Sequence, residues 1–444
     1  MNNRVLVIGA GKSGINAAKL LMSKGYAVTL FDGNPQTDKS AIRKILGDAE
    51  ILLGDIGEDD IKTFDMAVIS PGVPLDNPLV VKINNLNVKI IGEIELGYMY
   101  EKGTVVAITG TNGKTTTTTL VGDILKKWKS NTIVAGNIGL PYTDEVVKSE
   151  NDSISVIEVS SFQLETIDTF HAHVAAILNI TPDHLDRHKT MEAYAEAKFN
   201  VTKNQTEDDF VVMNYDDDRL REFSKKCKAH VIWFGRLNKP KTGYYYRDRV
   251  ISRIYEDREE KLLNVDDINL IGDHNYENVM AALAIAEAAG VPSGTAIEVT
   301  KAFKAVEHRI EKVDIINGVV YYNDSKGTNT DASVKAIKAM SRPTLLIAGG
   351  YDKNSTYDDF IDSFDGKIKE LVLIGATAEK IKACALKHGF TNIKTADSLE
   401  EAVSICKSDS EEGDAVLLSP ACASWDMFKS YEERGRLFKK AVRG

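Results

Sequence analysis

The sequence predicts an α/β protein made of three successive blocks, each organised around a sheet of mainly parallel strands. Short apolar runs alternate with helical patterns through the chain, and this alternation is typical of parallel α/β sheets. Glycine-rich turns follow two of these runs and open helices. The length of 444 residues exceeds one ordinary domain. We place the domain limits at residues 1–97, 98–299 and 300–444.

The first block opens with a βαβ unit. A short apolar run at its start is typical of a buried parallel strand, and a proline–glycine turn ends its last predicted strand. The expected elements are a strand over 5–8, a glycine turn over 9–14, a helix to Lys24, a strand over 28–32, a strand over 67–70 and a turn over 71–74.

The second block begins with a strand that runs into a second glycine turn. Its closing helix ends at Gly290 and Pro292, which act as stop signals. The expected elements are strands over 105–109, 155–159 and 174–180, helices from 114 to about 127, over 191–204 and over 275–289, and an aromatic, β-like stretch over 243–255.

The third block repeats the alternation of strands and helices. Strands are expected over 319–323, 344–349, 371–374 and 415–419, with helical patterns between them. Such an order predicts another parallel α/β sheet.

Composition excludes several classes of protein. Hydrophobic residues make up 43% and charged residues 27% of the chain, an ordinary globular balance. A net charge of −10 disfavours a general nucleic-acid binder, which needs a basic face. The four cysteines form no CxxC pair, which suits a reducing cytoplasm. No signal-peptide layout and no apolar run of membrane-spanning length occur, so we expect a cytoplasmic protein without a membrane span.

The strongest functional signal is the glycine turn between a strand and a helix in the second block. Glycines let backbone N–H groups converge on a phosphate, and the helix N-terminus adds a favourable dipole. The lysine can reach the β- and γ-phosphates of a nucleotide, and the following hydroxyl can ligate Mg²⁺. The spacing is shorter than in the usual phosphate-binding loop. The residues predicted to bind ATP here are Gly110, Thr111, Asn112, Gly113, Lys114, Thr115 and Thr116.

The first glycine turn, Gly9-x-Gly11-x-x-Gly14, allows three interpretations. Asp32 ends the second strand, where an acid that binds a ribose would lie in a dinucleotide site. A tight turn without any ligand gives the same pattern. A nucleotide without nicotinamide, such as a UDP group, is the third interpretation, and the phosphate loop downstream favours it.

Glu158 and the segment 179–188 are candidates for a metal site. Glu158 interrupts a buried apolar run, and a buried acid is costly unless it is paired with a base or bound to metal. His184 follows a strand, where ligands lie in open α/β sheets, and could ligate or orient a metal. We expect His188 to be a solvated surface histidine. Lys198 by itself is an ordinary helix lysine, which is usually exposed.

The later motifs offer nucleotide and phosphate contacts. Asn275 and Asn278 lie one turn apart and suit adenine or ribose recognition, and the alternative is that Asp273 or Asn275 caps the helix, which is compatible with the first role. Arg309 suits contact with a phosphoryl group in transfer. The loop around Asp324 and Lys326 offers an acid for a ribose, a cation and hydroxyl groups. Cys422 lacks an evident His partner, so a structural role is favoured over that of a nucleophile.

Together these segments resemble the motifs of the Mur ligase family over almost the whole chain, most closely the branch that adds D-glutamate to UDP-N-acetylmuramoyl-L-alanine. The GAGKSG and SPGVP turns favour this branch over sister ligases that add L-alanine or a diamino acid, or that glutamylate folate. The Asp at 273 and Gly327 are mild departures. The matching motifs are GAGKSG at 9–14, SPGVP at 70–74, TGTNGKTTT at 109–117, GNIGLP at 136–141, EVSSFQLE at 158–165, NITPDHLDRH at 179–188, EAK at 196–198, GDHNYEN at 272–278, EHRIE at 307–311, NDSKGTN at 323–329 and LSPACASWD at 418–426.

The resemblance implies an N-terminal Rossmann-like domain for the UDP group, a central P-loop ATPase-type domain and a C-terminal Rossmann-like domain. It implies ATP, D-glutamate, two Mg²⁺ ions and a carbamylated Lys198, in an enzyme of peptidoglycan precursor synthesis on which cell-wall formation, cell shape and cell division depend. An alanine carboxylate would attack the γ-phosphate of ATP, and the amine of D-glutamate would attack the resulting acyl phosphate. A monomer is expected.

The resemblance also implies roles for single residues. The catalytic set is Lys114, His184, Lys198, Arg309 and Lys326. Metal ligands are Thr115, Glu158, His184 and Lys198, and further ATP contacts are Asn275, Asn278, Arg309 and Asp324. The UDP substrate would contact Gly11, Lys12, Ser13, Asp32, Gly72, Asn137 and His184, and D-glutamate would contact Lys326, Thr328, Lys353, Ser424, Trp425 and Tyr431.

Two rival functions come from other classes of protein. A nicotinamide-dependent dehydrogenase would use the first block but leave the phosphate loop and the third block without a role. A P-loop switch or simple ATPase would not need the charged loops of a third domain.

Overall fold

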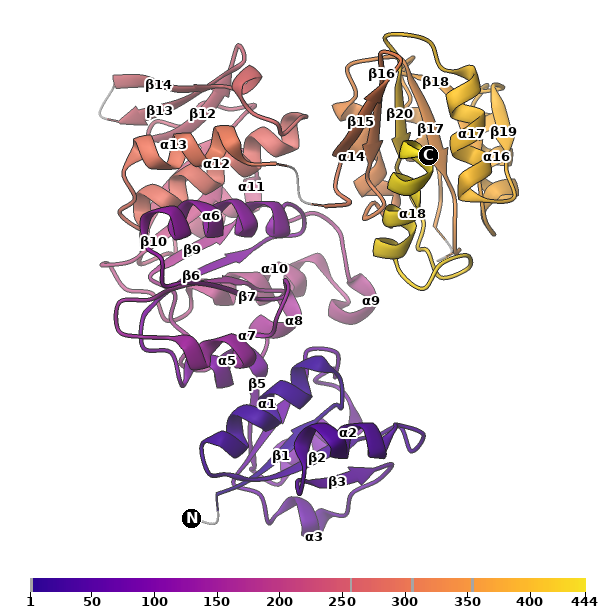
Figure 1. The fold of residues 1–444 in the computed structure, drawn as a ribbon. Helices are drawn as coiled ribbons and strands as arrows, with labels where there is room; N and C mark the ends of the chain where they lie inside the picture. Colours follow the sequence, from indigo (N-terminus) through magenta and orange to yellow (C-terminus); the bar gives the residue numbers. More distant parts are fainter. Residues whose placement is uncertain (1–2, 256–257, 305–306, 353–354) are drawn as a thin grey trace. The chain divides into compact units, whose positions relative to one another are not determined.

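The structure is a computed structural model that describes residues 3–255, 258–304, 307–352 and 355–444 (Figure 1). The chain forms two compact units. The first comprises the residues up to Asn264 together with Glu277–Lys301, and the second comprises Val265–Tyr276 and Ala302–Gly444. Three sheets with helices around them confirm the predicted three-domain α/β fold, whereas the predicted domain limits stay a prediction.

The first sheet has five parallel strands in the order β3-β2-β1-β4-β5. The strand order reverses between β1 and β4, which is where ligands bind in open α/β sheets. Its strands are β1 (Arg4–Ile8), β2 (Ala27–Asp32), β3 (Glu50–Leu53), β4 (Met66–Ile69) and β5 (Lys89–Gly92). Its helices are α1 (Lys12–Ser23), α2 (Lys39–Leu46), α3 (Glu58–Ile61) and α4 (Pro78–Asn85).

The second sheet has nine strands in the order β14-β13-β12-β11-β10-β9-β6-β8-β7. The strands from β7 to β12 in this order are parallel, and β13 and β14 add an antiparallel edge. The strands are β6 (Thr104–Thr109), β7 (Thr132–Gly136), β8 (Ile154–Glu158), β9 (Val174–Ile177), β10 (Phe210–Asn214), β11 (His230–Gly235), β12 (Gly243–Arg247), β13 (Val250–Tyr255) and β14 (Arg258–Asn264).

Short helices connect the first two sheets, and longer helices cover the second. One buried apolar cluster runs from Val5 and Val7 of β1, through Ile94 and Leu96, to Val105 of β6, so the two sheets share a core. The helices are α5 (Glu93–Tyr98), α6 (Lys114–Trp128), α7 (Tyr142–Glu145), α8 (Ser161–Leu164), α9 (Leu185–His188), α10 (Met191–Phe199), α11 (Asp218–Ser224), α12 (Asp273–Ala288) and α13 (Ser293–Ala302).

The third sheet has six strands in the order β15-β16-β20-β17-β18-β19, and only β15 is antiparallel to its neighbour. Two apolar clusters fill its two faces. The strands are β15 (Glu311–Ile316), β16 (Val319–Asn323), β17 (Thr344–Ala348), β18 (Ile368–Leu373), β19 (Ile393–Thr395) and β20 (Ala415–Leu418). The helices are α14 (Thr330–Ala339), α15 (Asp358–Asp362), α16 (Ala378–Lys387), α17 (Leu399–Asp409) and α18 (Tyr431–Arg443).

Two predicted elements are too long. The predicted strand over 174–180 ends at Ile177, because Leu178 and Asn179 turn toward the phosphate loop, where the Leu178 N–H donates to the Thr109 carbonyl. The predicted helix over 191–204 is α-helical only to Phe199 and continues as a 3₁₀ turn over Asn200–Thr202. Among the helices of the described residues, none combines the length and the apolarity that a membrane crossing requires.

Candidate active site

The phosphate loop joins β6 to α6 and needs glycine at two positions. Gly110 has φ +147° and Gly113 has φ +86°, which are conformations that favour glycine. A Cβ on Gly113 would lie 2.2 Å from the Asn278 Oδ1, so α12 closes against the loop here. The loop is also tied to Asn179, because the Asn112 N–H donates to its Oδ1 at 2.9 Å. Gly113 caps α6, whose N-terminus therefore faces the loop and favours an anion.

Two lysines converge on one carbonyl oxygen of this loop. The Nζ of Lys114 donates to the Gly110 carbonyl at 3.0 Å, and the Nζ of Lys198 donates to the same oxygen at 2.8 Å. Lys198 is only 1% exposed, which corrects the expectation of an ordinary exposed helix lysine. Burial, followed by the positive charge of Lys114, lowers the pKa of Lys198 well below its ordinary value. Lys198 is therefore shifted toward the neutral amine.

Glu158 is the last residue of β8, and one of its two carboxylate oxygens accepts a hydrogen bond. Its Oε1 accepts from the Asn137 side-chain amide at 2.9 Å. Its Oε2 is buried without a hydrogen-bond partner among the described residues, and the residue is 1% exposed. No ion pair to a basic side chain is formed within the described part of the chain. A buried anionic oxygen without a donor suits a hard cation, so the donor set fits Mg²⁺.

The two histidines of the segment 179–188 differ from each other. His184 is exposed, adopts a left-handed conformation with φ 52°, and its ring lies edge-on to Phe162 at 4.9 Å. His188 is buried, so the prediction of a solvated surface histidine is wrong. Because α9 is a single turn, its last residue packs between α8 and α10, and the His188 ring contacts Ser161 at 3.0 Å and lies 5.3 Å from the Tyr194 ring. Burial lowers the pKa of His188.

Five of the predicted UDP-binding residues lie at or after the ends of strands of the first sheet, namely Gly11, Lys12, Ser13, Asp32 and Gly72, whereas Asn137 and His184 lie in the second-sheet part. A cavity of about 400 Å³ at the switch point of the first sheet is lined by residues that include Gly9, Asp32 and Asn77. The carboxylate of Asp32 accepts from the Ala10 N–H at 2.8 Å and from the Asn34 N–H at 2.9 Å. These hydrogen bonds stabilise the turns that follow β1 and β2. The ammonium of Lys12 donates to the Gly139 carbonyl at 2.6 Å.

The glycines that follow β1 and β4 have different surroundings. A Cβ on Gly14 would lie 1.8 Å from the Gly9 carbonyl oxygen, so glycine is needed there for close packing of helix and strand. A Cβ on Gly11 or on Gly72 would meet nothing within 4 Å. Ser13 is half-buried beside them. Their open surroundings leave room for a ligand close to the backbone.

In the third-sheet unit, Asp324 lies buried at the end of β16. Its Oδ2 accepts from the Ser419 hydroxyl at 2.7 Å, and its Oδ1 accepts from the Ile310 N–H at 3.3 Å. Burial raises the pKa of Asp324 to about 7, against the lowering effects of the Ser419 hydrogen bond and the Arg309 charge. The Nε of Arg309 is buried without a hydrogen-bond partner among the described residues.

Two of the predicted D-glutamate residues, Lys326 and Tyr431, lie close to each other. The Nζ of Lys326 lies 5.6 Å from the ring centroid of Tyr431, which begins α18. Ser424 is buried, Thr328 is half-buried, and Trp425 is 65% exposed with its ring 5.6 Å from that of Tyr351. Lys353 lies outside the described residues.

The two predicted nucleotide amides both lie in α12. Asn275 is buried, and its side-chain amide donates to the Ile271 carbonyl at 2.8 Å. Asn278 is buried against the phosphate loop. Their roles in ATP binding, like the other residue roles, stay predictions.

Two residues that sequence reasoning passed over hold the site loops of the third sheet. Arg434 of α18 is fully buried and donates to the Ser325 hydroxyl and carbonyl and to the carbonyls of Cys422 and Ala423. Burial lowers its pKa to about 10. His308 accepts from the Asn323 amide at 2.9 Å, and its carbonyl accepts from the Lys326 N–H at 3.0 Å. The sequence does not show that Arg434 and His308 are buried, because the residues that contact them lie in loops distant in sequence.

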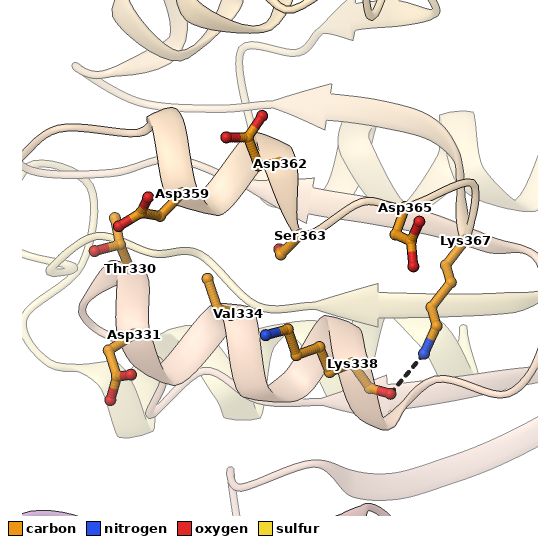
Figure 2. Close-up of a pocket in the computed structure, with 9 residues that line it drawn as sticks. All are labelled: Thr330, Asp331, Val334, Lys338, Asp359, Asp362, Ser363, Asp365 and Lys367. Carbon is orange, nitrogen blue, oxygen red and sulfur yellow. Dashed lines mark hydrogen bonds between the residues drawn. The ribbon is translucent and has the colours of Figure 1, made fainter.

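Two other features near the third sheet lack the chemistry of a catalytic site. Cys422 is buried, its thiol contacts Tyr357 and Thr377, and burial raises its pKa, which agrees with a structural cysteine. A cavity of about 680 Å³ lies between α14 and α15 (Figure 2). Acidic and basic side chains line it together, and the Lys367 ammonium donates to the Lys338 carbonyl at 2.6 Å. None of the predicted site residues lines this cavity.

Three sheets with a phosphate loop, a buried carboxylate and two convergent lysines define a nucleotide-dependent α/β enzyme. Three family models match the chain: Mur ligase MurD-like, N-terminal domain over residues 3–92, Mur ligase middle domain over 108–286, and Mur ligase, glutamate ligase domain over 308–422. The chain belongs to the Mur ligase family.

Full-length relatives agree with this assignment. The UDP-N-acetylmuramoylalanine--D-glutamate ligase of Lachnospira eligens is 53% identical over 99% of this chain and 98% of that protein. The enzymes of the same name from Lachnoclostridium phytofermentans and Clostridioides difficile are 52% and 46% identical, over 100% and 99% of this chain and 98% of each relative.

Solved structures show the same fold at lower identity. The UDP-N-acetylmuramate-alanine ligase MurC from Thermotoga maritima matches with a TM-score of 0.61 and 19% identity, over 99% of both chains. The MurF ligase from the same organism, in complex with ADP, matches with a TM-score of 0.60 and 17% identity, over 99% of this chain and 95% of that one.

Proposed function

We propose that this chain is an ATP-dependent ligase that joins D-glutamate to UDP-N-acetylmuramoyl-L-alanine in peptidoglycan precursor synthesis. The observation that carries the proposal is full-length similarity to ligases of that name, at up to 53% identity among those cited above. The phosphate loop, the buried Glu158 and the paired lysines on Gly110 supply the chemistry that such a ligase requires.

The reaction follows from the charges of the site. The alanine carboxylate attacks the γ-phosphorus of ATP, the bond to the β-phosphate breaks, and ADP leaves with its electron pair. The amine of D-glutamate then attacks the acyl phosphate carbonyl, loses a proton and expels phosphate. Lys114 at the phosphate loop and Arg309 would neutralise charge that develops on the transferring phosphoryl group.

Side chains of the chain itself would hold Mg²⁺ beside the phosphates, through the oxygens of Thr115 and Glu158 and a ring nitrogen of His184. Thr115, Glu158 and His184 are the proposed ligands, and the orphan Oε2 of Glu158 is the observation that fits them best. A bound Mg²⁺ would offset the negative charge of the phosphate oxygens. Two ions rather than one form part of the proposal, because a carbamate on Lys198 would add further oxygen ligands.

Carbamylation of Lys198 fits its surroundings. A neutral amine attacks the carbon of CO₂ and releases one proton to water, which leaves a carbamate anion on Nζ. Burial and the nearby Lys114 charge favour the neutral amine that this step needs. The carbamate would remove the positive charge that repels Mg²⁺ and would supply two oxygens that bind the ion.

The two substrates are assigned to the first and the third sheet. We place the UDP group at the switch point of the first sheet, where the 400 Å³ cavity lies. A nicotinamide-dependent reaction there would leave the phosphate loop and the third sheet without a role. We place the glutamate carboxylates near Lys326, Ser424 and Tyr431. A cytoplasmic location and a monomeric state belong to the same proposal.

Phosphate release from ATP tests the function directly. Release is expected only when UDP-N-acetylmuramoyl-L-alanine and D-glutamate are both present. Equal release with L-glutamate, L-alanine or a diamino acid would favour another ligase of the family. Strong release without any amino acid would favour a simple ATPase, and saturable NADH binding at the first sheet would favour a dehydrogenase.

A further inference from the structure

Two basic side chains join the ligand loops of the first sheet to the loops of the second. Lys12, which begins α1 directly after the glycine turn that follows β1, donates to the Gly139 carbonyl of the loop after β7 at 2.6 Å. Arg187 of α9 donates in the opposite direction, to the carbonyls of Pro71 at 2.8 Å and Val73 at 3.4 Å, in the loop after β4. The strands β1 and β4 flank the switch point of the first sheet. Both loops at the proposed UDP site are therefore tied to the catalytic part of the same compact unit.

Arg187 and Lys12 differ in how easily they can change their hydrogen-bond acceptor. The Arg187 side chain is 14% exposed, donates also to Glu165 at 2.7 Å, and lies 3.9 Å from the Phe162 ring centroid. Lys12 is exposed, and the acceptor described for it is one neutral carbonyl. A lysine ammonium is a strongly hydrated point charge on a flexible stem. Arg187 is thus a fixed connection, whereas Lys12 is free to exchange its acceptor.

The loop that Lys12 contacts leads directly to Glu158. The Gly136 N–H donates to the Leu140 carbonyl at 3.0 Å, which closes the loop on itself. The Asn137 N–H donates to the Glu158 carbonyl at 2.8 Å, and the Asn137 side-chain amide donates to the Glu158 Oε1 at 2.9 Å. Gly139 is therefore only two residues from Asn137, whose side-chain amide orients the buried carboxylate of Glu158.

We propose that Lys12 is an exchangeable latch between the UDP site and Glu158. This inference rests on the proposed function, because it takes the diphosphate of the substrate as the competing acceptor. The Lys12 ammonium is held more strongly by a phosphate anion than by a neutral carbonyl, because the opposite charges attract each other. The N-terminus of α1 attracts the same anion. Binding of the diphosphate moves the Lys12 ammonium from Gly139 to a phosphate oxygen, loosens residues 137–140 and lets Asn137 and Glu158 reorient for the metal.

Amide hydrogen exchange of the full chain tests the latch, with UDP and uridine as probes. UDP should accelerate exchange over residues 137–140 in the wild type, and uridine, which lacks phosphate, should not. In Lys12→Met the same residues should exchange fast without ligand, and UDP should add nothing. Loss of one charge-assisted hydrogen bond should weaken UDP binding about tenfold or more, with uridine binding unchanged.

Matched variants separate the latch from a general effect of charge or folding. Lys19→Met removes an exposed lysine from the same helix and should respond to UDP as the wild type does. Lys12→Arg keeps a cation and should keep most of the response. Unchanged UDP affinity in Lys12→Met, or the same exchange response to uridine and UDP, would overturn the latch alone. Absence of saturable UDP binding to the wild type would overturn the proposed UDP site and the latch with it.

Discussion

Replacing Lys198 with Met should stabilise the metal-free chain while it removes ligase activity. Lys198 is 1% exposed, and burial lowers its pKa well below the ordinary value of 10.5. Between that lowered value and 10.5 the unfolded chain binds more protons than the folded chain, so the free energy of unfolding of the wild type rises with pH. Methionine has no titrating group. Its advantage over lysine should be greatest at low pH and should disappear as the pH approaches 10.5.

The size of the effect follows from what the substitution removes. The Lys198 hydrogen bond to Gly110 at 2.8 Å is lost, which costs about 1 kcal/mol. The Gly110 carbonyl still accepts from Lys114 at 3.0 Å, so no buried acceptor is orphaned. Removing a buried amine and its desolvation gains about 1–3 kcal/mol. The net gain expected near pH 7 is about 1 kcal/mol.

Urea unfolding with a chelator and CO₂-free buffer measures the stability, and phosphate release with bicarbonate measures the activity. Lys198→Ala should lose most activity and regain part of it with acetate, which can fill the place of the carbamate. Lys198→Arg should stay inactive, because a guanidinium keeps its charge and takes up no CO₂. A loss of more than about 2 kcal/mol in Lys198→Met would refute the stability argument, and full activity of Lys198→Arg would refute the carbamate.

Four further outcomes are expected. Lys114→Ala should lower turnover on the order of 10²-fold or more with little change in melting temperature, and near-normal kcat would remove the phosphate loop from the mechanism. Glu158→Gln keeps the acceptor for Asn137 but loses the anionic ligand, so it should raise the Mg²⁺ concentration needed for half-maximal phosphate release, and an unchanged requirement would contradict the metal site. Arg434→Lys should lose about 2–3 kcal/mol of unfolding free energy and raise the KM for D-glutamate more than that for ATP, and an equal rise in both would indicate a global defect. Because burial raises the pKa of Asp324 to about 7, the unfolding free energy should fall as the pH rises from 3.8 through about 7, and Asp324→Asn should flatten this fall in urea titrations at several pH values.

Central strands such as β1, β6, β8, β17 and β20 could be predicted from sequence, whereas the interior strands β10 and β11 and the edge strands β3, β14 and β19 were not predicted. Runs such as residues 5–8 and Ala415–Leu418 are apolar throughout because both faces of a parallel strand are buried. β3, β14 and β19 carry exposed polar residues and lie at sheet ends, so their pattern does not separate them from loops.

The sequence also did not show which polar residues are buried, apart from Glu158. Glu158 stood out because it interrupts an apolar run. Lys198 and His188 lie in short helices whose patterns do not show which face is covered, and each is buried by residues from distant segments, Gly110 and Ser161 respectively. Arg434 gave no signal, because its four acceptors come from two loops of which the first is 109 residues away.

The order in which Arg434 and its acceptors occur in the chain bears on biosynthesis. Ser325 leaves the ribosome 109 residues before Arg434, and every strand of the third sheet is translated before α18. A nascent chain can therefore pair its strands while the loops around Ser325 and Cys422 still lack the cation that ties them. The proposed D-glutamate site would then form last, after the proposed nucleotide site of the second sheet.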